Sequence, residues 1–390
     1  MTHTMPKQIG DYNKNQMLSL LRERGPTSRV ELAKLMGISQ TAISRSTSRL
    51  LENGIIRECE AKDSVMGRKP VPVELCGDFC HVLAADIVGG TIRTAIADFL
   101  GVIVDYHEEH IVKDKGANAV MDQVLRVLRN IIAGTSIPRE KIWGITIGTP
   151  GIFDPGSGKS RFTFFMDKWD DIDIRSMIYE ALSIDTLIEN DVNLDVLGES
   201  WKGVGKDYEN ILYVKLGQGL ASRVVLGGNL LRGEHNMAGE IGYMMPGFSG
   251  AKGRSSLNEI SNYEHMLCNS SASRRYGELT GGKSVETISD LCAMSNNGDK
   301  AAGKVMDNLL DQFSVVLSNS ITVLDPQVVI LGGDACNFGE KEITHLKRRI
   351  SQFFPITLNI IPSLLKKQAC LYGAIKMSLD RVETRITDIW

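Results

Sequence analysis

The chain has 390 residues, of which 43% are hydrophobic and 23% are charged; this length exceeds one ordinary domain, and the composition is that of a globular protein. No apolar run reaches the roughly 18 residues of a membrane span, and the N-terminus lacks the apolar core of a signal peptide, so we expect a cytoplasmic protein. Residues 1–76 hold 12 basic and 8 acidic side chains whereas the remainder holds 32 and 39, which indicates a basic head that meets a polyanion.

The first sixty residues predict three helices. Apolar spacing predicts a helix over 14–24, Ser28 is a natural N-cap for a second helix, and a third is expected over 39–53 after a turn at Gly37. Two short helices, a glycine turn and a polar third helix are typical of a helix-turn-helix.

Short polar side chains and arginines share the exposed face that we expect on the third helix. Short hydrogen-bonding groups let a helix enter the major groove, and arginines reach phosphates or guanine edges. A solvated helix face is the alternative, but the upstream helix and turn favour DNA binding. The predicted DNA-contacting residues are Gln40, Thr41, Ser44, Arg45 and Arg49.

After Gly54, two extended stretches flank a polar tip, which suits the wing of a winged helix. Arg68 and Lys69 lie in this tip, where an arginine would enter a narrow minor groove. A basic loop before a linker is the alternative interpretation.

From residue 81 the pattern changes to three β-rich runs, a helical segment over 117–134 and an apolar strand. A similar cycle of strand, glycine turn and strand restarts near residue 210, and a long helix is expected over 300–324. This repetition predicts two related α/β lobes with a cleft between them.

The succession resembles the ROK family of repressors, open reading frames and kinases. The matching stretches are the run over 86–98, GTPGIFD, ENDVNLDVLGE, LRGEHNMAGEIGY and VVILGG. The resemblance implies an α/β protein, with an N-terminal winged helix-turn-helix followed by a two-lobed actin-like sugar kinase (ribonuclease H-like) fold. The expected domains are 1–76, 77–200 and 201–390, with the C-terminal helix returning to the first lobe.

The resemblance also implies a sugar site. Asp191 matches the general base that takes the proton from the sugar hydroxyl in the family's kinases. The alternative interpretation is structural, because an Asn-Asp pair is also common where a strand ends. Tyr243 replaces a family histidine, and can still hydrogen-bond a sugar. The predicted sugar-binding residues are Asn190, Asp191, Glu240, Tyr243 and Glu259, and His235 is treated as structural or peripheral.

The family's zinc motif is altered. Its three cysteine positions become Gly250, Lys252 and Leu257, and its histidine becomes Tyr243. The seven cysteines of the chain are scattered and form no C-x-x-C pair. We therefore expect no structural zinc, because four ligands cannot be assembled.

Three departures affect the expected nucleotide site. Val88 replaces a glycine of the first phosphate loop, and Asp334 brings a carboxylate under the expected adenine. In the second loop, Gly217 and Gly219 remain, but Arg223 is expected to obstruct the phosphate. We therefore expect neither ATP binding nor enzyme activity.

These observations predict a DNA-binding transcriptional repressor of carbohydrate-utilisation genes whose kinase-like body binds a sugar or sugar derivative without phosphorylating it. The expected partners are double-stranded operator DNA and a second copy of the chain, as a dimer or tetramer, with no membrane. The alternatives are an ATP-dependent sugar kinase with an appended DNA-binding head, and a regulator whose body docks a protein.

Overall fold

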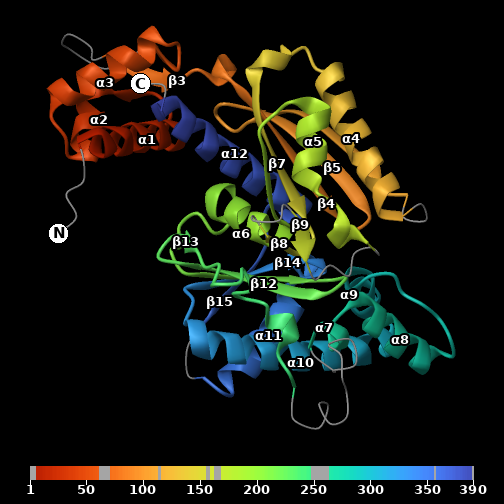
Figure 1. Ribbon diagram of the computed structural model, residues 1–390. Coiled ribbons are helices and arrows are strands. Elements are labelled where there is room, and N and C mark those ends of the chain that lie inside the picture. Colours follow the sequence, from red (N-terminus) through yellow and green to blue (C-terminus); the bar gives the residue numbers. More distant parts are fainter. Residues whose placement is uncertain are drawn as a thin grey trace.

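The computed structural model describes residues 6–60, 71–112, 116–154, 159–161, 168–246, 263–354 and 357–388. A helical head lies at one end of the molecule, beside the first of two lobes, each built around a sheet (Figure 1). No helix among these residues is long and apolar enough to cross a membrane.

The head contains three helices and a small sheet. Its elements are α1 (Pro6–Arg24), β1 (Thr27–Ser28), α2 (Arg29–Met36), α3 (Gln40–Glu52), β2 (Ile56–Glu58) and β3 (Pro72–Leu75), with strand order β1-β3-β2. The Ser28 and Ser39 hydroxyls accept from the Glu31 and Ala42 amides, and Gly37 ends α2 in the left-handed region. The second and third predicted helices are confirmed. The first helix begins eight residues earlier than predicted. The prediction missed residues 6–13 because they lack the apolar stripe that indicates a helix.

A five-stranded mixed sheet forms the first lobe, in the order β10-β7-β4-β5-β6. Its strands are β4 (His81–Val88), β5 (Thr91–Asp98), β6 (Ile103–His110), β7 (Ile142–Thr149) and β10 (Thr186–Asn190). Alternate residues of β4 face opposite sides: Leu83 and Ala85 pack towards α4 (Gly116–Gly134) and α5 (Ile174–Leu182), whereas Val82 and Ala84 pack towards α12 (Ala369–Asp388). The lobe is therefore a sheet between two helical layers.

The second lobe repeats this topology. Its sheet has the order β13-β12-β11-β14-β15, so that in both lobes one central strand pairs with an antiparallel and a parallel neighbour. The strands are β11 (Ile211–Leu216), β12 (Leu220–Leu226), β13 (Asn229–Leu230), β14 (Val328–Gly333) and β15 (Asn359–Pro362). The predicted repetition of the α/β unit is confirmed.

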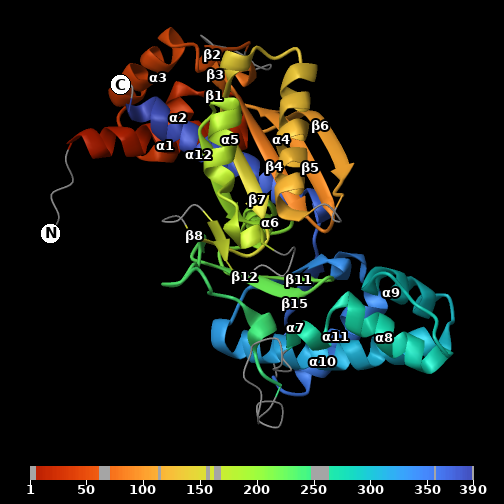
Figure 2. The same cartoon turned by 45° about the vertical axis from the view of Figure 1, so that its right-hand side comes forward.

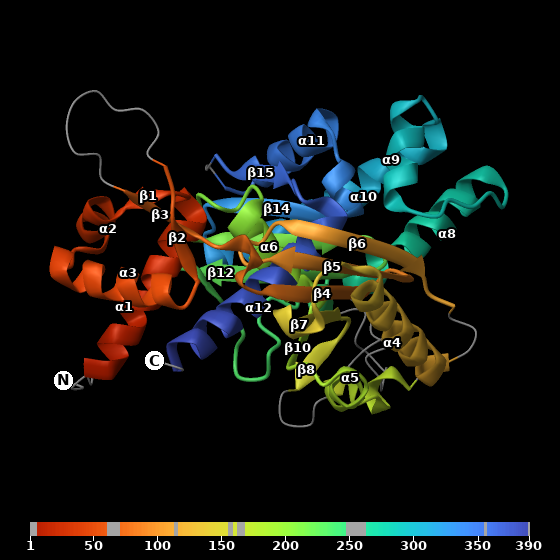
Figure 3. The same cartoon turned by 90° about the horizontal axis from the view of Figure 1, so that it is seen from above.

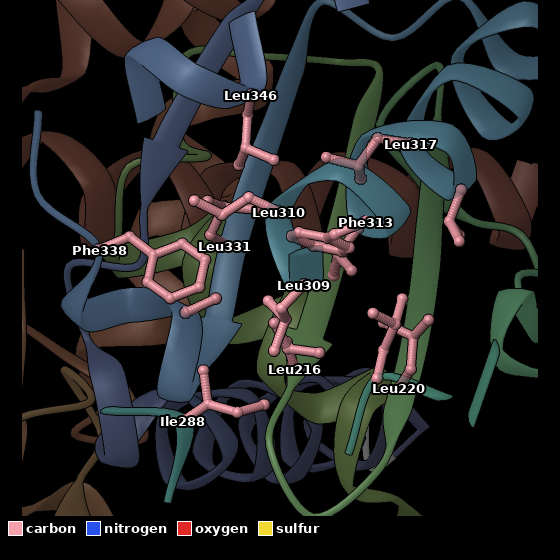
Figure 4. Packing of buried hydrophobic residues seen from close by; sticks show 14 of the residues in the cluster. Leu216, Leu220, Ile288, Leu309, Leu310, Phe313, Leu317, Leu331, Phe338 and Leu346 are labelled. Carbon is pink, nitrogen blue, oxygen red and sulfur yellow. The ribbon is translucent and has the colours of Figure 1, made fainter. Parts of the chain in front are cut away.

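Helices from one long stretch of chain cover this second sheet: α7 (Tyr263–Met266), α8 (Asn269–Thr280), α9 (Ile288–Asn296), α10 (Lys300–Leu324) and α11 (Glu340–Ser351). Figure 4 shows Leu309 and Phe313 of α10 in the same buried cluster as Leu216 and Leu331 of the sheet. The remaining short elements are β8 (Ile152–Asp154), β9 (Lys159–Arg161) and the 3-10 turns Gly77–Phe79, Arg139–Lys141, Trp169–Asp171, Ile241–Tyr243, Asp334–Asn337 and Lys366–Gln368.

The C-terminal helix α12 leaves the second lobe and packs on β4, β7 and α6 (Asp191–Lys202). It extends from the first lobe towards the head (Figures 1 and 2). The α6 and α12 backbones are in close contact: a Cβ on Gly198 would lie 2.1 Å from the Ala369 carbonyl oxygen, and one on Gly373 would lie 1.9 Å from that of Leu194. We propose the domain division given above, with α12 joined to the first lobe.

We expect Gly373→Ala to lower the free energy of unfolding by about 1–3 kcal/mol, because the added methyl group has no room unless the helices separate. Urea denaturation of the full chain measures this change. Gly303→Ala on α10 is the matched control, since its nearest neighbour would be the Ser295 hydroxyl at 3.6 Å. A Gly373→Ala protein as stable as the wild type would contradict the close contact.

Candidate functional site

The exposed face of α3 is the first candidate site. All five predicted DNA-contacting residues of α3 are exposed, while Ile43, Thr47 and Leu50 are buried on the opposite face. Arg29 of α2 donates to the Thr47 hydroxyl and pairs with Glu58, which fixes the helix against its neighbours. The arrangement presents two arginines and three short polar side chains to a partner. Arg68 and Lys69 lie outside the described residues.

The second candidate site lies between the lobes, where β10 ends and α6 begins. Asn190 is the N-cap of α6, and its side-chain oxygen accepts from the Val192 and Asn193 amides, both at 3.0 Å. Its amide nitrogen donates to the Gly151 carbonyl at 2.8 Å. Both polar atoms therefore have partners within the chain, which fixes the start of α6, and the sugar-binding role of Asn190 stays a prediction.

Asp191 and Asp195 share one cation. The Lys215 ammonium, on β11 of the second lobe, lies 2.8 Å from Asp191 Oδ2 and 2.8 Å from Asp195 Oδ2. Burial alone would lower the pKa of Lys215, but Asp191 and Asp195 together raise it well above its usual value. The lysine is therefore charged and holds the start of α6 against the second sheet.

Burial, reinforced by the Asp191 charge, raises the pKa of Asp195 to about 7 despite Lys215. Burial likewise raises the pKa of Asp86, at the far end of β4, against the opposing effects of Lys215 and Arg93. Arg93 donates to Asp86 Oδ2 at 3.0 Å. Asp86, Asp191 and Asp195 are therefore three buried carboxyl groups that share the charges of Lys215 and Arg93.

Arg223 is not where the sequence placed it. Its side chain is fully buried, donating to Asn190 Oδ1 at 3.1 Å and to Glu240 Oε1 at 2.7 Å. Because β12 side chains alternate between two faces, Arg223 points towards the end of β10 and not towards the loop that precedes it. The prediction that Arg223 obstructs a phosphate is wrong; the residue joins the predicted sugar-binding segments of the two lobes.

A third cation crosses between the lobes. Arg232, which follows β13, lies 2.6 Å from Glu189 Oε2, and the other Glu189 oxygen accepts from the Asn190 amide and the Asn193 side chain. Residues 189–195 thus receive Lys215, Arg223 and Arg232 from the second lobe. These contacts join the two lobes at the start of α6.

Glu240 precedes the turn Ile241–Tyr243, and Tyr243 is the last residue of that turn. Burial, together with the charges of Glu264 and Glu240, raises the pKa of Tyr243 to about 12, so its hydroxyl keeps its proton and can donate to a ligand. The structure therefore brings Glu240 towards Asn190 and Asp191 through Arg223. Glu259 lies outside the described residues, and His235 is exposed.

Two carboxylates lie against the second glycine loop. Glu264 accepts from the Leu220 amide, and a Cβ on Gly219 would lie 2.3 Å from Glu264 Oε1. Burial raises the pKa of Glu264 to about 7. A Cβ on Gly217 would lie 3.1 Å from Asp334 Oδ2, and burial raises the pKa of Asp334 as well. The loop backbone therefore still lies close to neighbouring groups, but these are the Glu264 and Asp334 carboxyl groups of the chain itself.

The first glycine loop retains two left-handed glycines, Gly89 at φ 66° and Gly90 at φ 82°, which turn β4 into β5. Val88 is the last residue of β4 and is half-buried. The altered zinc motif over 250–259 lies outside the described residues, so its expectation stays a prediction. Elsewhere in the described chain, no group of three His, Cys, Asp or Glu side chains could hold a metal ion.

Sequence reasoning missed Lys215, Glu189, Asp195 and Glu264. Lys215 lies in an apolar strand, where a single lysine usually indicates an edge strand or a solvent-exposed position. Its partners Asp195 and Asp191 are 20 and 24 residues away in the sequence. The ENDVNLD segment did carry a signal, since three acids within seven residues require cations when they are buried.

Residues 82–381 match the ROK family, and residues 11–57 match a winged helix-turn-helix DNA-binding family. The xylose repressor of Bacillus subtilis is 26% identical over 96% of this chain and 97% of its own. A solved ROK family transcriptional regulator, a homologue of the E. coli MLC protein, is similar with a TM-score of 0.81 at 20% identity, covering 97% of this chain and 98% of that chain. The ROK hexokinase of Thermus thermophilus is similar with a TM-score of 0.64 at 23% identity, covering 78% of this chain and 99% of that one. The predicted winged helix-turn-helix followed by a sugar kinase-like α/β fold is confirmed.

Proposed function

Because the chain belongs to the ROK family, we propose that it is a sugar-responsive, DNA-binding transcriptional repressor of carbohydrate-utilisation genes. The observation that supports this function most directly is that one chain combines the exposed face of α3 with an acidic cluster between the lobes, which contains Asp191 and Glu240. The xylose repressor of Bacillus subtilis matches 96% of the chain, head included, which supports the same assignment.

Operator recognition is assigned to α3 and the wing. Arg45 and Arg49 reach base edges or phosphates, and Gln40, Thr41 and Ser44 donate and accept hydrogen bonds in the major groove. The predicted wing residues Arg68 and Lys69 add phosphate or minor-groove contacts. Two copies of the chain would read a palindrome, since a two-fold protein matches a two-fold site.

Sugar recognition is assigned to Asp191, Glu240 and Tyr243, with Glu259 as a further contact and Asn190 holding the start of α6. Carboxylates accept from vicinal hydroxyls, and the protonated tyrosine donates. Hydroxyls that approach Asp191 and Glu240 compete with Lys215 and Arg223, so a sugar alters the contacts that set the lobe arrangement. Xylose is the first effector to test, because the full-length relatives are named xylose repressors.

We further propose that the body does not phosphorylate its sugar. Lys215 already engages Asp191, the residue that would act as base, and Glu264 and Asp334 bring carboxylates to the loop that would receive a triphosphate. A sugar kinase with a DNA-binding head is the second candidate, favoured by Asp191 itself and by the fold shared with the Thermus thermophilus hexokinase.

An ADP-release assay separates these candidates. With the full chain, ATP and a panel of D-xylose, D-glucose and D-glucosamine, we expect no turnover above the enzyme-free rate, because Lys215 engages Asp191 and the Glu264 and Asp334 carboxyl groups lie against the loop that would receive the phosphates. The same preparation must bind operator DNA, which shows that it is folded. Sugar-dependent ADP release would establish the kinase.

A further inference from the structure

A buried arginine, Arg22, lies at the junction of the head and the body. Arg22, in the last turn of α1, forms an ion pair with Glu383 of α12 and donates through Nε and Nη2 to the Phe99 carbonyl, at 3.2 and 3.1 Å. Its guanidinium carbon also lies 5.1 Å from the centre of the Phe99 ring. The Arg22 and Glu383 side chains are only 3% and 8% exposed. One side chain thus ties the head to the β5–β6 turn and to the C-terminal helix.

The same turn receives the far end of α6. A Cβ on Gly101 would lie 2.3 Å from the Trp201 ring, so the last turn of α6 packs directly on the turn that Arg22 holds. The first residue of α6 is Asp191, which belongs to the proposed sugar site. Its 12 residues span about 18 Å at 1.5 Å per residue. One helix therefore runs from the acidic cluster to the junction with the head.

Gly198 and Gly373 leave no gap between the α6 and α12 backbones, so we expect a displacement of α6 to displace α12. The hydrophobic core is continuous as well: Leu21 of the head, Leu194 of α6 and Val382 of α12 belong to one buried cluster. Figure 3 shows α12 reaching from beneath the first sheet to the side of the head. A displacement at the start of α6 is therefore expected to move both groups that Arg22 contacts, the Phe99 carbonyl and the Glu383 carboxylate.

We propose that Arg22 and Glu383 are the positioning residues through which sugar binding at the start of α6 changes the orientation of the DNA-binding head. The inference rests on the proposed function. A buried ion pair that loses one partner leaves an uncompensated charge, so the head must follow α12 and the Phe99 turn when they move. Without the pair, the head keeps its fold and its DNA-contacting face, but its orientation no longer depends on the sugar.

The experiment measures operator affinity with and without sugar for full-length wild type and Glu383→Gln. The DNA is a duplex that the wild type selects from a random pool, and the sugar is the member of the panel above that most weakens wild-type binding. We expect the sugar to change wild-type affinity by about 5- to 150-fold. In Glu383→Gln the ratio of operator affinity without sugar to operator affinity with sugar should fall to within about 2-fold of one. Sugar affinity and sugar-free operator affinity should stay within about 3-fold of the wild type.

Asp380→Asn is the matched control, because Asp380 forms an exposed ion pair with Lys376 on the same helix, and its ratio should equal that of the wild type. If Glu383→Gln fails to fold, Arg22→Lys takes its place, since lysine keeps the charge but loses the second donor to Phe99. An unchanged ratio in a folded variant overturns this inference and leaves the proposed function standing. A wild type that no sugar affects overturns both.

Discussion

Replacing Arg45 by alanine is expected to weaken operator binding by roughly 10- to 100-fold, which corresponds to about 1–3 kcal/mol for an arginine that contacts a base or phosphate. Arg45 is exposed on α3, one turn before Arg49, on the face opposite the buried Ile43 and Leu50. Fluorescence anisotropy with labelled operator DNA measures the loss. A phosphate contact would also reduce the salt dependence of binding, whereas a base contact would relax specificity at one position.

The matched control is Arg129→Ala, which removes the same charge from an exposed position on α4 of the first lobe. It should leave operator affinity within about 2-fold of the wild type, since only charges at the interface release counterions. An Arg45→Ala protein that binds the operator as tightly as the wild type would contradict the assignment of α3 as the recognition helix.

The second large effect is expected from Asp191→Asn. Losing a charged hydrogen bond to a sugar hydroxyl costs about 1.5–3 kcal/mol, so sugar affinity should fall by roughly 10- to 150-fold. Sugar-free operator affinity should stay within about 2-fold of the wild type, because the asparagine side-chain oxygen still accepts from Lys215, which also keeps its contact with Asp195. Isothermal titration with the active sugar measures the first quantity, and anisotropy with operator DNA measures the second.

Asp195→Asn provides the comparison, because it replaces the other carboxyl group that contacts Lys215, at a residue we do not assign to sugar contact. Lys215 keeps one carboxylate in either variant, so a general effect of disturbing the lysine would appear in both. Equal loss of sugar affinity in the two variants would show that Asp191 acts through Lys215 rather than by touching the sugar.

The sequence predicted the local features well. The Ser28 N-cap, the Gly37 turn and the expected range 39–53 place two helices of the head within a residue or two of α2 and α3. The repeated order of strand, glycine turn and strand predicts the antiparallel pairs β4–β5 and β11–β12, because these strands are consecutive in the chain, whereas the parallel pairs β4–β7 and β11–β14 join distant segments. These predictions depend on short-range patterns, which one sequence contains in full.

The contacts between distant segments could not be predicted. Arg22 and Glu383 are 361 residues apart, and nothing near either one indicates its partner. Arg223 was misplaced because a loop motif gave its position along the chain but not the face of β12 on which it lies. Side-chain direction at the end of a strand depends on register, and a shift of one residue reverses it.

Operator affinity of the full chain, measured by anisotropy with and without each sugar of the panel, tests the central claim most directly. We expect at least one sugar to weaken operator binding by about 5-fold or more without any added ATP, because the sugar itself changes the lobe contacts that Lys215 and Arg223 make. Identical binding curves with every sugar would contradict a sugar-responsive repressor.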